Sequence, residues 1–167
     1  MGIMNLGYVI LEMQDPAKWS KFAQDILGFG EAEPFGEINT KYLRMDNAPF
    51  RYMVRKGNKD RFLAGGYEIS SKSDFENQIE LFERSGIDVY RGTKAEADCR
   101  AVEAFVSVKD PSGNTVEIFY GRAPDKSFLP GHGIRKFITG AMGLGHMVLP
   151  APENETTISF YEDLMGF

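Results

Sequence analysis

Residues 6–11 read LGYVIL, and residues 144–149 read LGHMVL. The likeness continues without a gap as far as Phe29 and Phe167, at a constant offset of 138 (146 minus 8). Seven of the 24 aligned pairs are identical. Because the match covers a strand pattern, a cap region and a terminal glycine, it indicates an internal duplication. The chain is therefore predicted to hold one whole domain and the first strand and helix of a second.

The repeated stretch itself predicts a strand that runs into a helix. Residues 6–12 alternate and are rich in β-branched and aromatic side chains, and Asp15-Pro16 then supplies an N-cap followed by proline at the first helical position. Apolar residues follow at helical spacing until Gly28 ends the pattern. We expect this stripe to pack on a sheet; it consists of Trp19, Phe22, Ala23, Ile26 and Leu27.

The same order of elements is predicted twice. Further strands are expected at 41–45, 50–55, 62–70, 87–90, 102–109 and 115–120. A capping box that starts at Ser73 predicts a helix with a buried face and a stop at Gly86, and Thr93 with Glu96 predicts a short helix. The buried face of the longer helix would hold Phe75, Ile79 and Phe82. The order β-α-β-β(-β) thus spans about residues 4–57 and again about 62–121.

This order predicts an α+β fold in which two similar halves lie side by side, with helices outside mostly antiparallel strands. Residues 122–143 hold two prolines and four glycines without a sustained period, which indicates a linker. The expected organisation is a first domain over 1–121, the linker, and an incomplete second domain over 144–167. We expect the last segment to pack on the first domain or to pair with another subunit, since an unpaired strand is a template for association.

Composition narrows the functional classes. Of the 167 residues, 43% are hydrophobic, which suffices for one well-packed domain and part of another. The net charge of -5 disfavours nucleic acid as a partner, and the basic stretch 51–61 alternates like a strand with one wet face. No apolar run is long enough to span a membrane. Cys99 is the sole cysteine, so no intramolecular disulfide can form and a cytoplasmic location is expected.

Four motifs together carry a family resemblance. They are LGY at 6–8, DPSGNTVEIFYG at 110–121, FITG at 137–140, and GLGHMVL at 143–149 with FY at 160–161 and LMGF at 164–167. Over its whole length the chain resembles the vicinal oxygen chelate (glyoxalase/bleomycin resistance) superfamily. It is most similar there to the type I extradiol ring-cleavage dioxygenases of the 2,3-dihydroxybiphenyl 1,2-dioxygenase kind. The DPxGN turn marks only the superfamily, whereas FxTG and GxGH are more specific.

The resemblance implies paired βαβββ modules that form a cupped sheet, and an oxidoreductase of aromatic hydrocarbon catabolism. It also implies a metal-free first domain and a second domain that holds Fe(II) through two histidines and one glutamate. His146 matches the first of those histidines, and the other ligands and the catalytic residues would lie beyond Phe167. From the residues alone, a core histidine with one satisfied nitrogen is favoured over a metal ligand at His146, and the resemblance reverses that preference. A homo-oligomer in the cytoplasm is expected.

A set of two histidines and one carboxylate suits ring cleavage because it leaves one side of Fe(II) open. A catechol can chelate there through both oxygens while dioxygen takes an adjacent position. Since His146 is the one ligand that the resemblance assigns, we expect the 167-residue chain alone to bind no stoichiometric iron and to cleave no ring. The full-length protein would take a catechol-like aromatic substrate and O2 as partners, without nucleic acid or a membrane.

The first domain offers a weaker ligand set at the corresponding positions. These positions hold about Tyr8, Met53, Gly65 or Gly66, and Glu117, of which Glu117 alone would ligate a hard cation strongly. We expect Glu117 instead to pair with a neighbouring arginine or to face solvent. Tyr8 is expected to be a core residue whose hydroxyl is satisfied.

Two other reactive side chains are expected to be incidental, and two other functions stay open. Cys99 lies in a polar run without a histidine beside it, and His132 lies between two glycines in the linker. One alternative function is a non-enzymatic binding module that holds a small hydrophobic ligand or a partner in its cupped sheet. The other is a glyoxalase-like metalloenzyme, which would need all its ligands within residues 1–121.

Overall fold

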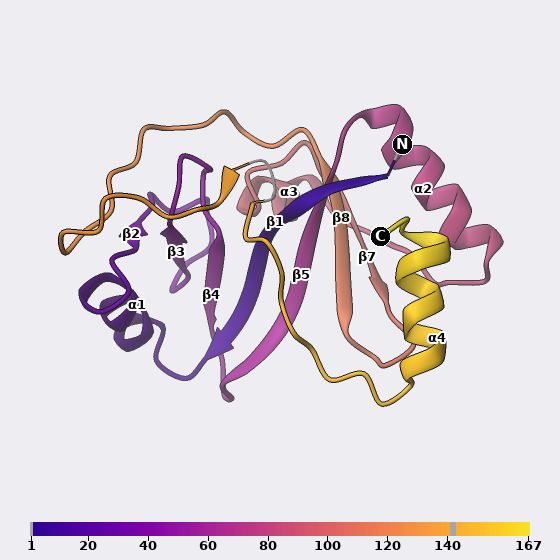
Figure 1. Cartoon of the computed structure of the whole chain (residues 1–167), viewed down its shortest axis with the longest axis horizontal. Coiled ribbons are helices and arrows are strands. Elements are labelled where there is room, and N and C mark those ends of the chain that lie inside the picture. The colour runs from indigo at the N-terminus through magenta and orange to yellow at the C-terminus, as the bar shows by residue number, and fades with distance from the viewer. Residues whose placement is uncertain (1, 141–142) are drawn as a thin grey trace.

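The computed structural model describes residues 2–140 and 143–167, which form one eight-stranded sheet with helices packed on it (Figure 1). The strands are β1 (Ile3–Met13), β2 (Gly30–Glu31), β3 (Lys41–Arg44), β4 (Tyr52–Lys56), β5 (Arg61–Ile69), β6 (Tyr90–Arg91), β7 (Ala104–Lys109) and β8 (Thr115–Tyr120). The helices are α1 (Pro16–Asp25), α2 (Lys72–Arg84), α3 (Lys94–Cys99) and α4 (Asn154–Ser159), which a π-helical turn, η2 (Phe160–Leu164), continues. Across the sheet the strand order is β2-β3-β4-β1-β5-β8-β7-β6.

The sheet consists of two halves that meet at its centre. β1 and β5 run antiparallel to each other, and each runs parallel to the last strand of its own half, β4 or β8. The remaining neighbours pair antiparallel. The first half has the order βαβββ, and the second half has the same order with the short helix α3 added between β6 and β7. The predicted α+β fold of paired modules with mostly antiparallel strands is confirmed.

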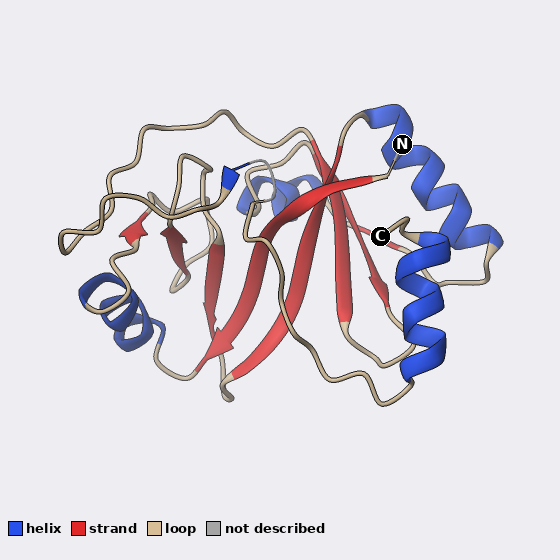
Figure 2. Ribbon diagram, in the orientation of Figure 1, coloured by secondary structure: helices blue, strands red, loops and turns tan. Residues whose placement is uncertain are grey.

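The two faces of the sheet carry different cores because side chains alternate along each strand. On β8, Ile118 packs in the cluster of α2, whereas Phe119 points to the opposite face. On β4, Val54 packs in the cluster of α1, whereas Met53 lies in the same cluster as Phe119. We call the side that α1 and α2 share the helical face and the other side the cupped face (Figure 2).

α1 begins as predicted but buries a different side. Asp15 accepts a hydrogen bond from the amide of Lys18 and Pro16 starts the helix. The expected apolar stripe is wrong for three of its members, since Phe22, Ile26 and Leu27 are 49%, 66% and 36% exposed. The small side of the helix, with Ser20 and Ala23, faces the sheet instead. Small side chains let the helix lie close on β3 and β4, and the last turn ends at Asp25, before Ile26.

The predicted N-cap of α2 is wrong, whereas the predicted capping box of α3 is confirmed. The sequence predicts Ser73 as the cap of α2, but the Ser71 hydroxyl accepts from the Asp74 amide and Ser73 lies inside the first turn. Ser71 has the extended backbone that an N-cap requires, with φ -152° and ψ 162°. The predicted buried face of α2 is confirmed. The capping box of Thr93 and Glu96 on α3 is also confirmed. β6 is shorter than predicted and starts only at Tyr90.

After β8 the chain crosses the molecule without regular structure. Residues 121–139 contain neither helix nor strand and run past the end of the sheet that holds β2 and β3 (Figure 2). The Lys126 amide donates to the Asn47 carbonyl over 2.8 Å, and the Asn47 side chain accepts from the Phe128 amide over 3.1 Å. This path agrees with the absence of a period in the sequence.

The chain then returns to β1 at Gly143. Gly143 forms a parallel bridge with Leu6 on the edge of β1 that faces β4. That edge is open because β1 pairs with β4 only from Val9 onward. Residues 144–149 form no strand, contrary to the prediction. A first strand of this kind takes neighbours that correspond to β4 and β5, and the described residues contain no second pair of such strands.

The predicted helix that follows is present and packs beside α2 on the helical face (Figure 1). Phe160 and Met165 are 3% and 1% exposed. The ring of Phe160 lies parallel to that of Phe82, with centroids 5.9 Å apart, and Gln78 donates to the Leu164 carbonyl over 2.8 Å. The expectation that this segment packs on the preceding fold is confirmed. No helix in the described parts of the chain is both long and apolar enough to cross a membrane.

Candidate functional site

The centre of the cupped face brings together two of the residues singled out by sequence. In the sheet register Tyr8 on β1 lies opposite Gly66 on β5, and Gly66 lies beside Glu117 on β8. The Tyr8 hydroxyl donates a hydrogen bond of 2.7 Å to Oε2 of Glu117, and both residues are buried. The glycine leaves room for the tyrosine ring, since a Cβ at Gly66 would lie 2.2 Å from Tyr8 Cε2. The Tyr8 ring also stacks on Phe119 at 4.9 Å between centroids.

A third residue, Arg100, completes this site. Its Nε and Nη2 donate to the two carboxylate oxygens of Glu117 over 2.7 and 2.6 Å, which is a bidentate pair. The guanidinium also lies 3.9 Å from the ring centroid of Phe105. The pair is almost fully enclosed, because 9% of the Arg100 side chain and 4% of the Glu117 side chain are exposed.

The electrostatics of the three groups favour one protonation state. Burial raises the pKa of the Tyr8 hydroxyl well above its ordinary value, and the negative charge of Glu117 raises it further. Burial alone would lower the pKa of Arg100, but its hydrogen bonds and attraction to Glu117 outweigh burial and raise it. Tyr8 therefore stays neutral and Arg100 stays charged. The expectations of a satisfied Tyr8 hydroxyl and of an arginine partner for Glu117 are confirmed, and a solvent-facing Glu117 is wrong.

This arrangement cannot serve as a metal centre. The guanidinium of Arg100 occupies both oxygens of Glu117, and Met53, in the same cluster, is a fully buried thioether. In residues 2–140 and 143–167 no group of three His, Cys, Asp or Glu side chains could hold a metal ion. The described residues therefore include no complete set of ligands for an iron ion.

Arg100 is the member of the site that the sequence does not single out. It lies at the C-cap of α3, directly after the predicted short helix. A signal for it exists in β8, where Glu117 stands between Val116 and Ile118 in a strand with apolar residues on both faces. A carboxylate in such a strand requires a buried cation, and that requirement points to an arginine without saying which one.

His146 lies away from this centre, in the segment that follows Gly143. It is exposed and lines a cavity of about 550 Å³ with Met147, Leu149, Tyr161 and other residues. In the wall of the same cavity, Asp110 accepts a hydrogen bond of 3.2 Å from the Tyr161 hydroxyl. Burial raises the pKa of Tyr161, and the neighbouring Tyr67 and Asp110 raise it further. The structure thus brings Tyr8 and Glu117 together and leaves His146 separate from them.

The two remaining candidates have no functional geometry. Cys99 is half-buried, and burial raises the pKa of its thiol, which disfavours the reactive thiolate. His132 is exposed in the irregular segment at φ +55°. Both observations agree with the incidental roles expected from the sequence.

Known proteins resemble this chain along its whole length. A family model described as dihydroxybiphenyl dioxygenase BphC D1 matches residues 6–57. The chain is 32% identical over 167 residues to an iron-dependent extradiol dioxygenase of Rhodococcus jostii (strain RHA1), covering 100% of this chain and 55% of that protein. It is 33% identical over 169 residues to a biphenyl-2,3-diol 1,2-dioxygenase of Paraburkholderia xenovorans (strain LB400), covering 100% and 56%. The chain is thus similar to extradiol dioxygenases from end to end.

Solved structures of extradiol dioxygenases share the same architecture. A crystal structure of a catechol 2,3-dioxygenase superposes with a TM-score of 0.92 at 30% identity, covering 99% of this chain and 59% of that one. A 2,2',3-trihydroxybiphenyl 1,2-dioxygenase from Sphingomonas wittichii strain RW1 superposes with a TM-score of 0.80 at 26% identity, covering 99% and 57%. The chain spans about half the length of the curated relatives that it matches.

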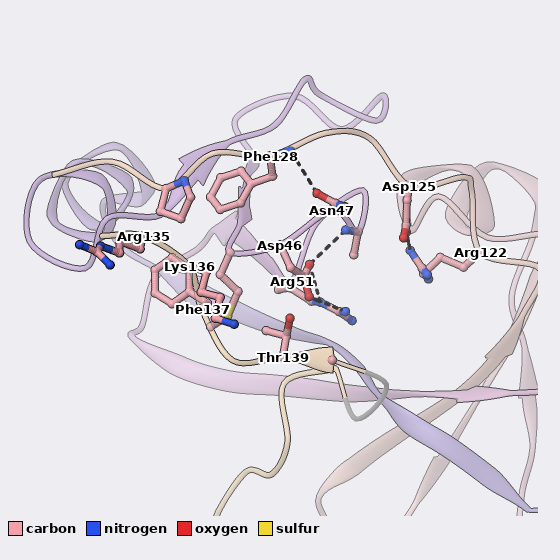
Figure 3. A pocket seen from close by; sticks show the side chains of 14 residues that line it. Asp46, Asn47, Arg51, Arg122, Asp125, Phe128, Arg135, Lys136, Phe137 and Thr139 are labelled. Atoms are coloured by element: carbon pink, nitrogen blue, oxygen red, sulfur yellow. Dashed lines mark hydrogen bonds and ion pairs between the residues drawn. The ribbon is translucent and has the colours of Figure 1, made fainter. Parts of the chain in front are cut away.

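A second cavity of the chain is explained by contacts that hold its wall together. It has a volume of about 330 Å³ and lies between the turn after β3 and residues 122–140 (Figure 3). Asp46 in its wall accepts from Nε and Nη2 of Arg51, over 3.0 and 2.7 Å, and Arg51 also donates to the Gly7 carbonyl over 2.8 Å. Asn47 holds the backbone of Phe128 on the opposite side. Asp46 is thus paired within the wall of the cavity, and Asn47 fastens residues 126–128 to the turn after β3.

Proposed function

We propose that this chain is the N-terminal part of an Fe(II)-dependent extradiol dioxygenase that opens a catechol-type ring with O2. In this proposal residues 1–121 are a metal-free first domain, residues 122–143 are a linker, and residues 144–167 begin the iron-binding domain. His146 is then the first iron ligand, and the other ligands follow Phe167 in the longer protein. A cytoplasmic homo-oligomer is part of the same proposal.

One observation carries the assignment of His146. The offset of 138 places His146 at the position of Tyr8, and Tyr8 meets Glu117 from the last strand at 2.7 Å. A second domain with the same fold would therefore bring His146 next to the residue that stands 138 positions after Glu117. A histidine and a carboxylate at these two places are two of the three ligands that hold Fe(II) with open positions.

The test uses the complete protein, read through to the stop codon of its gene. His146→Ala should reduce bound iron per chain and abolish O2 uptake with a catechol, because loss of one of three ligands weakens the site. His132→Ala is the matched control, since it removes an exposed histidine from residues 122–143 and should leave both quantities unchanged. Wild-type iron content and O2 uptake in His146→Ala would contradict the assignment.

We further propose that the substrate is a catechol with a substituent or fused ring beside one hydroxyl. Similar proteins are named a biphenyl-2,3-diol dioxygenase, a 1,2-dihydroxynaphthalene dioxygenase and a 3-methylcatechol dioxygenase. All three names describe such a compound. O2 uptake by the complete protein should be faster with biphenyl-2,3-diol or 3-methylcatechol than with 3,4-dihydroxyphenylacetate. The opposite order would contradict this substrate class.

A further inference from the structure

The helix formed by α4 and η2 has two distinct sides, and the described residues cover one of them more completely than the other. Phe160 and Met165 are buried in the cluster of α2, and the buried Thr157 lies 2.8 Å from the Ser112 hydroxyl. Ile158 lies on the other side, is 46% exposed and lines the cavity beside His146. The two sides can be assigned by comparison with α1, because the offset of 138 aligns the two helices residue by residue.

In α1 the side that corresponds to Ile158 faces the helix's own sheet. Ser20 aligns with Ile158, and Ala23 aligns with Tyr161. Ser20 and Ala23 are 2% and 0% exposed, and Ala23 packs against β3 and β4. The Ile158 side of α4 is therefore the side that would pack on a second sheet. The opposite side of α4 and η2, which holds Phe160, is the side that contacts the first domain.

The equivalent contact side of α1 is uncovered. Phe22, Ile26 and Leu27 align with Phe160, Leu164 and Met165. Phe160 and Met165 are 3% and 1% exposed, whereas Phe22 and Leu27 are 49% and 36% exposed. The same side of the same helix is thus buried in one copy and open in the other.

Two copies of one domain that pack around a two-fold axis make each contact twice, as residue i with j and as j with i. The packing of α4 on α2 is one of these two contacts. The other would be the packing of α1 on the second copy of α2. Both helices lie on the helical face at opposite ends of the sheet, so one domain laid across that face can reach both (Figure 1).

We propose that Phe22, Ile26 and Leu27 form the seat for the second-domain helix that corresponds to α2. This inference rests on the proposed function only in requiring that the longer protein contains a second domain. The existing contact specifies the occupant. An aromatic ring should cover Phe22 as Phe82 covers Phe160, and a side-chain amide should donate to the Ile26 carbonyl as Gln78 donates to that of Leu164.

Thiol labelling of the complete protein tests the seat. Ile26→Cys should react with a water-soluble maleimide at least about tenfold more slowly than Lys21→Cys in the folded protein, because the reaction requires an exposed thiolate. Lys21 is on the solvent side of α1, with 78% of its side chain exposed, and is the matched control. Both variants are made with Cys99→Ser, and both should react alike in urea.

Two results would overturn the proposal. One is equal labelling of the two cysteines in the folded protein. The other is protection of Ile26→Cys that disappears on dilution together with an oligomer, which would assign the face to another subunit. Iron content and O2 uptake of the same variants test the proposed function separately. A result that contradicts the proposed contact of α1 can therefore be distinguished from one that contradicts the dioxygenase activity.

Discussion

At the scale of single residues, Arg100 and Glu117 form a buried ion pair at the centre of the cupped face. The carboxylate keeps its place on the last strand, and a guanidinium supplies the positive charge from the end of α3. Taking two charges out of water is costly, and the bidentate geometry and the Tyr8 hydrogen bond offset that cost. The pair is therefore expected to be sensitive to the loss of one partner.

Arg100→Met should destabilise the chain by about 3 to 5 kcal/mol, because it leaves Glu117 buried without a cation. Adding Glu117→Gln to it should recover part of this loss, since a neutral amide needs no counter-charge. Urea unfolding measures both free energies. Arg91→Met removes an exposed arginine that pairs with Glu76 and Glu83, and it should cost less than about 1 kcal/mol. Equal losses for Arg100→Met and Arg91→Met would show that the buried pair is not special.

The residue scale also shows where sequence reasoning ends. Tyr8 and Glu117 can be singled out because a repeat and an alternating strand give them equivalent positions. Arg100 cannot, because its meeting with Glu117 depends on how α3 closes over the cupped face. That packing is a tertiary contact across 17 positions with no periodic pattern behind it.

At the scale of elements, the start of α2 depends on which of two serines has the extended backbone of an N-cap. Ser71 and Ser73 both precede an apolar stretch, and only Ser71 has its hydroxyl on the Asp74 amide. The pattern of residues places the helix correctly but cannot distinguish two serines two positions apart. The prediction of which side of α1 is buried is wrong for a related reason. Phe22 and Ile26 are apolar, but the described residues do not cover them.

Ser71→Ala should lower the free energy of unfolding by about 1 kcal/mol, because the Asp74 amide loses its acceptor. Ser73→Ala changes an exposed residue within the first turn and should stay within about 0.5 kcal/mol of the parent chain. Thermal or urea unfolding of the two variants checks the order. A larger loss of unfolding free energy in Ser73→Ala would show that Ser73 is the N-cap, as the sequence indicates.

At the scale of the whole molecule, the Asp46 and Arg51 pair joins the turn after β3 to β1, because Arg51 also donates to the Gly7 carbonyl. Burial would raise the pKa of Asp46, but Arg51 outweighs burial and holds it below its ordinary value. A carboxylate with a lowered pKa stabilises the folded state above its unfolded pKa, and the effect is lost as the pH falls through the folded value. The contribution is therefore present at neutral pH and disappears in acid.

Asp46→Asn should be less stable than the parent chain at neutral pH, and the difference should shrink as the pH falls below about 4. Urea unfolding at a series of pH values measures the difference directly. Asp88→Asn, which changes an exposed aspartate, should follow the parent chain at every pH. A difference between Asp46→Asn and the parent that does not depend on pH would remove the ion pair as its cause.

The bridge between Leu6 and Gly143 has a consequence for the order of folding. It joins positions that are 137 residues apart (143 minus 6), and a contact across an unfolded stretch of that length costs much loop entropy. The cost falls once the intervening chain has become a compact sheet with its ends already placed. Synthesis delivers all eight strands before Gly143 leaves the ribosome. The sheet, with the free edge of β1, can thus fold first. The segment at Gly143 then docks on a preformed surface.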